Sequence, residues 1–183
     1  MQKGQDNGSP EKSLISPGKD RRKIGLFLTS AALVVLLDQL SKSWIRDNPH
    51  PMELLPGFLD LVYIENRGAA FGLLANQTFL LIAITIASLI IILLLLHHLS
   101  PATTLSSISA SLIFGGTIGN LIDRLRFGCV TDFIDVRLWG SFHWPAFNFA
   151  DAAIVIGIPT LIYSLYQTGL FRKVYGHTHK IKN

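Results

Sequence analysis

An unusually long run of uncharged residues occupies the middle of this 183-residue chain. No Asp, Glu, Lys or Arg occurs between Gly68 and Ile122, a stretch of 55 residues. A helix that crosses a bilayer needs about 20 apolar residues, so this stretch has room for more than one span. Charged residues make up only 15% of the whole chain, against roughly a quarter in soluble domains. The sequence therefore predicts a polytopic membrane protein that is mainly α-helical.

Four segments are apolar and long enough to be predicted as transmembrane helices. They cover about residues 24–45, 79–97, 104–123 and 150–170. The first could be a signal peptide, but no A-x-A cleavage site follows it, so we expect a retained span. The third is rich in Ser, Gly and Thr, which indicates packing among other helices, with a re-entrant segment as the alternative.

The two ends of the chain are basic. Residues 1–23 carry six Lys and Arg, and residues 171–183 carry four. Positive charge is retained on the cytoplasmic side, so we expect both tails there, the first of them disordered. Contact of these tails with anionic lipids explains the net charge of +4, and no nucleic-acid partner is expected.

Residues of about 50–74, between the first two spans, are predicted to form a small β-rich platform on the outer membrane face. Their β-prone core, Phe58–Ile64, follows Pro56-Gly57 and precedes Asn66-Arg67-Gly68. In the third span, Gly115 and Gly119 form a G-x-x-x-G motif, which predicts close helix packing.

Four acidic residues lie at or near the predicted outer ends of the spans, where ionisable groups are costly and need a reason to be present. They are Asp38, Asp123, Asp132 and Asp151. Asn148 and Asp151 share one face of a first helical turn, so helix capping alone could explain them. Asn120, Asp123 and Arg124 repeat this arrangement, with an interfacial Asp123–Arg124 ion pair as the structural alternative.

Asp132 differs because it lies in an apolar stretch that returns to the membrane. If the third and fourth spans are neighbours, Asp132 can approach Asp151 at the outer leaflet. Two carboxyl groups that share a site do not easily both ionise, so the pair would offer one general base and one general acid. The alternatives are a structural role or an ion pathway in a transporter or channel. An ion pathway predicts ionisable residues through the depth of the spans, and Phe79–Leu96 contains none.

Other chemistries find less support in the sequence. The zinc-protease motif H-E-x-x-H is absent, and the adjacent His97 and His98 lie on the predicted cytoplasmic side. We therefore expect no metal and no other cofactor. The single cysteine, Cys129, has no His nearby in the sequence to activate it, so we expect a free thiol.

Five sequence blocks together resemble lipoprotein signal peptidase, also called signal peptidase II, and occur in that family's order. The blocks are DQLSK (Asp38–Lys42), ENRGAAFGLL (Glu65–Leu74), GGTIGNLIDR (Gly115–Arg124), GCVTDFIDV (Gly128–Val136) and PAFNFADAAIVIG (Pro145–Gly157). The resemblance implies an inner-membrane aspartic endopeptidase whose four-helix peptidase domain covers residues 24–170. It implies that both termini are cytoplasmic and that the active site lies near the outer face.

The resemblance also implies the substrate and the residues of the site. Such enzymes cut the signal peptide from a prolipoprotein just before its diacylglyceryl-modified cysteine. The family's catalytic pair matches Asp132 and Asp151. The residues matched to substrate binding or to support of the pair are Asn120, Arg124, Asn148, Asp38 and Asn66. We expect a monomer whose partners are lipid-modified prolipoproteins and membrane lipids.

Overall fold

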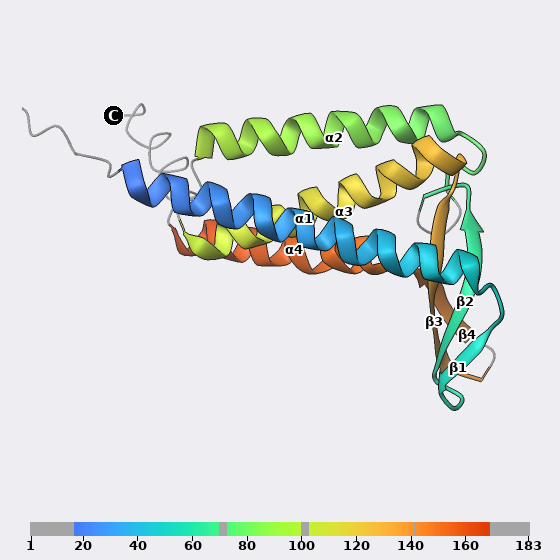
Figure 1. The fold of residues 1–183 in the computed structure, drawn as a ribbon. Coiled ribbons are helices and arrows are strands. Elements are labelled where there is room, and N and C mark those ends of the chain that lie inside the picture. The colour runs from blue at the N-terminus through green and yellow to red at the C-terminus, as the bar shows by residue number, and fades with distance from the viewer. Residues whose placement is uncertain (1–16, 70–72, 100–102, 141, 169–183) are drawn as a thin grey trace, which may run out of the picture.

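A computed structural model describes residues 17–69, 73–99, 103–140 and 142–168. Four helices lie side by side, and a four-stranded sheet lies across one end of them (Figure 1). The helices are α1 (Pro17–Asp47), α2 (Thr78–Leu99), α3 (Thr104–Phe127) and α4 (Phe149–Gln167). The fold is thus mainly helical with a small sheet, as predicted.

Within the part of the chain that the structure describes, three helices have the length and composition of membrane spans. They cover Arg21–Asp47, Thr104–Phe127 and Phe149–Gln167. In α2 the apolar segment Thr78–Leu94 is shorter, so its crossing of the membrane stays a prediction. Helix α3 is continuous over 24 residues, without the internal turn that a re-entrant segment would need.

The tail boundaries predicted from the sequence fall partly outside the described residues. Residues 1–16 and 169–183 are not described, so the expected disorder of residues 1–16 stays a prediction. Residues 17–23 are helical, because α1 begins at Pro17 rather than at residue 24. Proline suits a first helical turn, where its missing N–H is not needed.

Glycines on α3 bring α1 and α4 close to it. A Cβ at Gly115 would lie 2.8 Å from the carbonyl oxygen of Ala31 on α1, and one at Gly119 would lie 2.5 Å from Asp38 Oδ2. A Cβ at Gly116 would collide with the carbonyl oxygen of Ala150 on α4. The close packing predicted from Gly115 and Gly119 is confirmed, and α3 forms the centre of the bundle.

The sheet is antiparallel throughout, with strand order β1-β2-β3-β4. Its strands are β1 (Met52–Leu55), β2 (Leu59–Asn66), β3 (Val130–Trp139) and β4 (Phe142–Phe147). The first hairpin lies in the segment where the sequence predicted β structure. The second hairpin was not predicted, and it doubles the size of the sheet.

The start of β3 is set by the end of α3. Gly128 caps the helix with φ of 73°, a left-handed conformation that glycine adopts without strain, and its N–H donates to the carbonyl oxygen of Arg124 at 3.1 Å. The chain then enters β3, where Asp132 pairs with Ile64 of β2. Asn66 lies on the same face of β2 as Ile64, so the pairing brings Asn66 and Asp132 together as diagonal neighbours.

Candidate active site

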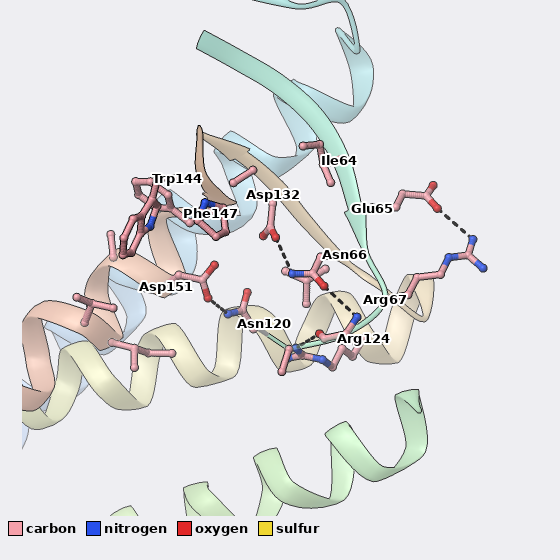
Figure 2. A pocket seen from close by; sticks show the side chains of 18 of the residues that line it. Ile64, Glu65, Asn66, Arg67, Asn120, Arg124, Asp132, Trp144, Phe147 and Asp151 are labelled. Atoms are coloured by element: carbon pink, nitrogen blue, oxygen red, sulfur yellow. Dashed lines mark hydrogen bonds and ion pairs between the residues drawn. The ribbon is translucent and has the colours of Figure 1, made fainter. Parts of the chain in front are cut away.

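Asp132 and Asp151 open into one pocket of about 850 Å³ at the sheet end of the helices. Figure 2 shows both carboxyl groups directed into the pocket, Asp132 from β3 and Asp151 from the first turn of α4. The pocket is also lined by three of the other predicted site residues, namely Asn66, Asn120 and Arg124. The expected approach of the two acids is thus present in the fold.

Asp132 is nearly inaccessible, with 2% of its surface exposed. Both of its carboxylate oxygens accept a hydrogen bond from a side-chain amide. Asn66 Nδ2 donates to Oδ2 at 2.8 Å, and Asn148 Nδ2 donates to Oδ1 at 2.7 Å. Each oxygen of this buried carboxyl group therefore has a hydrogen-bond partner within the protein.

Asp151 has a capping role and also lines the pocket. Its backbone N–H donates to Asn148 Oδ1 at 2.9 Å, while its own Oδ2 accepts from the backbone N–H of Asn148 at 3.3 Å. This reciprocal pair is a capping box. Asp151 Oδ1 accepts from Asn120 Nδ2 at 2.7 Å. The capping interpretation is therefore right, and Asp151 also lines the pocket, whereas Asn148 is fully buried behind it and donates to Asp132.

The orientation of the Asn120 amide follows from its neighbours. Its Oδ1 lies 2.9 Å from Lys42 Nζ, and an ammonium group has hydrogens to donate but no lone pair with which to accept. The Asn120 atom that faces Lys42 must be the oxygen. Its Nδ2 group must then face Asp151.

Backbone donors orient the other two asparagines by the same rule. Asn148 Oδ1 accepts from the backbone of Asp151, and Asn66 Oδ1 accepts from the backbone N–H of Gly68 at 2.9 Å. Both NH₂ groups must then face Asp132. Three side-chain amides thus direct their hydrogens at the two carboxyl groups, an arrangement that stabilises negative charge on them.

Burial raises the pKa of Asp132 to about 6, and the nearby charge of Asp151 adds to the rise. The hydrogen bonds from Asn66 and Asn148 and the charge of Lys42 limit the increase, because they stabilise the carboxylate. Asp132 consequently exchanges its proton near neutral pH. A general acid or base is most effective when its pKa lies close to the working pH.

This raised pKa predicts a pH-dependent difference in stability between the wild type and Asp132→Asn. The folded pKa of about 6 lies above the ordinary value of 3.8, so the folded state holds the proton more tightly and loses stability as the pH rises from about 4 to 6. Asn cannot titrate, so the variant does not lose this stability. Its free energy of unfolding, relative to that of the wild type, should rise by up to about 3 kcal/mol over this range. Thermal unfolding in detergent at a series of pH values measures this difference, and a constant difference would contradict the pKa.

Asp38 and Asp123 are fully buried, but they do not line the pocket. Asp38 Oδ2 lies 2.8 Å from Lys42 Nζ. The alternative of an Asp123–Arg124 ion pair is wrong, since Asp123 pairs with Lys42 at 3.3 Å and with Arg46 at 3.7 Å. Adjacent residues on a helix point in different directions, which leaves Arg124 directed at the pocket, where it donates to the carbonyl oxygen of Gly68 at 3.3 Å.

Lys42 is the residue of this region that the sequence reasoning missed. It is 0% exposed and connects Asp38, Asp123 and Asn120. A signal was available, because Asp38 and Lys42 are four residues apart at a predicted helix end and therefore share a face. The apolar wall contributed by Trp144 and Phe147 was also missed, because β4 was not predicted.

A metal site and a reactive cysteine were the other chemistries weighed from the sequence. Among the residues that the structure describes, no group of three or more His, Cys, Asp or Glu side chains is placed to hold a metal ion. The thiol of Cys129 is buried, and burial raises its pKa, which disfavours the reactive thiolate.

Comparison with known proteins identifies the family. Residues 30–167 match the family model described as Signal peptidase (SPase) II. The chain belongs to the signal peptidase II family. The lipoprotein signal peptidase of Moorella thermoacetica is 49% identical over 142 residues, which cover 76% of this chain and 91% of that protein. That of Syntrophotalea carbinolica is 41% identical over 151 residues, covering 79% and 93%.

The fold is also found among solved structures. One, titled as a bacterial membrane enzyme structure at 2.3 Å resolution, superposes with a TM-score of 0.70 at 34% sequence identity. The match covers 79% of this chain and 89% of that one. Most of this chain thus shares its fold with a solved bacterial membrane enzyme.

Proposed function

We propose that this chain is a membrane aspartic endopeptidase that removes the signal peptide of prolipoproteins by cleaving before the diacylglyceryl-modified cysteine. The observation that carries the proposal is the placement of Asp132 and Asp151 in one pocket, each held by asparagine amides. Membership of the signal peptidase II family supports the substrate class.

The chemistry follows from two carboxyl groups that share one proton. The ionised member removes a proton from a water molecule, whose oxygen attacks the scissile carbonyl carbon. When the tetrahedral intermediate collapses, the C–N bond breaks and the protonated member gives its proton to the departing nitrogen. Arg124, whose side chain lines the pocket, supplies positive charge where negative charge develops on the carbonyl oxygen.

The wall of the pocket suits a lipid-modified substrate. On α4 it includes Val155 and Ile156, whose side chains are 69% and 57% exposed and so face the surrounding lipid. Trp144 on β4 adds an aromatic surface to the same wall. A substrate that diffuses laterally in the bilayer can therefore reach the carboxyl groups without leaving the membrane.

The distribution of charge supports an orientation. We place both termini in the cytoplasm of a cell with the enzyme in its inner membrane, because Lys and Arg concentrate in the two tails. The sheet and the pocket then lie near the extracytoplasmic face, and α2 is the remaining span. The chain acts as a monomer, since the carboxyl groups and their amide partners all come from one copy.

Reporter fusions test this topology. Green fluorescent protein joined after Asn183 should fluoresce, and alkaline phosphatase joined at Asn76, just before α2, should be active. The fluorescent protein joined at Asn76 and the phosphatase joined after Asn183 should give no signal. The fluorescent protein functions only on the cytoplasmic side of the membrane, and the phosphatase only on the outer side. If phosphatase were active after Ser100 as well as at Asn76, α2 would not cross the membrane.

A matched pair of precursors tests the function. Purified protein in detergent should cleave a diacylglyceryl-modified precursor. The mass of the product should correspond to a chain whose first residue is the modified cysteine. The same precursor without the lipid serves as the control and should remain intact. Equal cleavage of both precursors, or cleavage at another bond, would contradict the proposal.

A further inference from the structure

Lys42 has a complete set of partners in the interior of the protein. Its Nζ lies 2.8 Å from Asp38 Oδ2, 3.3 Å from Asp123 Oδ2 and 2.9 Å from Asn120 Oδ1. An ammonium group has three hydrogens to donate, and here it meets three acceptors. With no exposed surface, Lys42 cannot exchange these partners for water.

The two acids bound to Lys42 also hold the backbone beside the catalytic pair. Asp38 Oδ1 accepts from the N–H of Ala150 at 3.0 Å, and Asp123 Oδ2 accepts from the N–H of Thr131 at 3.0 Å. Ala150 directly precedes Asp151, and Thr131 directly precedes Asp132. Each acid therefore fixes the chain one residue before one member of the pair.

We propose that Lys42 is a positioning residue for proteolysis, which sets the direction of the Asn120 amide and couples the two backbone anchors that hold Asp132 and Asp151. It acts on Asp151 through Asn120, whose oxygen must face the ammonium group and whose NH₂ group must then face the carboxyl group. This inference rests on the proposed function, because it assigns a role in the reaction of that same pocket.

A buried ion pair alone would not carry this assignment. Desolvation of two charges offsets much of their attraction, so such a pair need not add stability and need not matter to catalysis. What distinguishes Lys42 is the third partner. Asn148 Nδ2 also donates to Asn120 Oδ1, at 3.3 Å, but Lys42 is the closer donor and carries a charge. Without Lys42 the Asn120 amide is held less firmly and could turn over, which would present its oxygen to the oxygen of Asp151 and repel it.

The positive charge of Lys42 also acts on the pair, and it lowers the pKa of Asp132. Its removal should move both limbs of the pH–rate profile to higher pH, because each proton is then held more tightly. The charged groups that face this region come from several elements. They are Asp38, Lys42 and Arg46 on α1, Glu65 and Arg67 at the end of β2, Asp123 and Arg124 on α3, Asp132 on β3 and Asp151 on α4.

The test must avoid leaving two unpaired acids in the interior. Asp38→Asn/Lys42→Met removes one negative and one positive charge, keeps an oxygen for the Ala150 N–H, and leaves the Asp123–Arg46 pair in place. Comparison with Asp38→Asn isolates the contribution of Lys42. Asp123→Asn/Lys42→Met, compared with Asp123→Asn, gives a second balanced pair should the first not fold.

We expect loss of Lys42 in either pair to lower kcat by roughly 10- to 100-fold, since small misplacements of reacting groups cost this much. KM should stay close to that of the matched background. The pH–rate profile should move up by roughly half to one unit. The proposal would be overturned if a double variant had the same kcat and the same pH–rate profile as its matched single variant, and unfolded at the same temperature.

A double-mutant cycle tests whether Lys42 acts through Asn120. With Asn120→Ala already present, removal of Lys42 should cost little further kcat at the optimum pH, because the amide that it orients is gone. Fully additive losses would contradict this route.

Wild-type cleavage of the lipidated precursor, measured in parallel, separates the two proposals. Failure of the wild type to cleave would refute the proposed function, whereas failure of the Lys42 predictions alone refutes only the positioning role.

Discussion

Asp132→Asn and Asp151→Asn are each expected to bind the lipidated precursor but to cleave it at least about 10³-fold more slowly than the wild type. Each change keeps the size of the side chain and removes its ability to ionise or to pass a proton to and from water. Cleavage needs one ionised and one protonated carboxyl group, so neither member can substitute for the other. Steady-state rates and a binding assay on the same preparations measure the two properties separately.

Asp135 offers a matched control on the same strand. It lies three residues after Asp132, and its carboxylate pairs with His143 at 2.8 Å instead of lining the pocket. Asp135→Asn should therefore retain cleavage close to the wild-type rate. Equal losses from Asp135→Asn and Asp132→Asn would indicate a general effect of charge on the sheet and would contradict a specific pair.

Gly116→Val is expected to produce the second large effect. A Cβ at Gly116 would collide with the carbonyl oxygen of Ala150, and Ile154 Cγ1 lies 2.9 Å from the same position. Helix α4 must move away from α3, which carries Asp151 away from Asn120. We expect a loss of about 1–3 kcal/mol in stability and a loss of roughly 100-fold in kcat. Thermal unfolding and precursor cleavage measure the two effects.

Gly25 provides the control for this substitution. A Cβ built at Gly25 on α1 has nothing within 4 Å, so Gly25→Ala should leave activity unchanged and slightly favour the helix. If Gly116→Val cleaved precursor as fast as Gly25→Ala, the close approach of α3 and α4 would not be what positions Asp151.

Much of the helical part of this fold could be predicted from the sequence, because apolar length and Lys/Arg placement are local signals. The pairing of Asp132 with Asp151 could also be anticipated, since acids near membrane depth are rare and two fell near ends of neighbouring spans. The spacing singled out Asn120 and Asn148, but all three asparagines were assigned to the site through the motif blocks. Their orientations depend on which donors surround them, and only the fold specifies those donors.

The second hairpin and the role of Lys42 were beyond sequence reasoning for different reasons. The strand Val130–Trp139 mixes buried and exposed residues without clean alternation, and its register shifts between Ile134 and Val136 against β4. Lys42 has three partners, of which Asp123 and Asn120 are about 80 residues away in the chain. Contacts of that separation have no local signature, so a buried ammonium group looked like an ordinary charge at a helix end.

Single-turnover cleavage of the diacylglyceryl-modified precursor, followed from pH 4 to 9, tests the catalytic pair most directly. For the wild type we predict a bell-shaped dependence of the rate on pH, because activity needs exactly one proton on the pair. For Asp132→Asn and Asp151→Asn we predict rates at least about 10³-fold below that of the wild type at every pH. Cleavage before the modified cysteine by either variant, at a rate within tenfold of the wild type, would contradict the account.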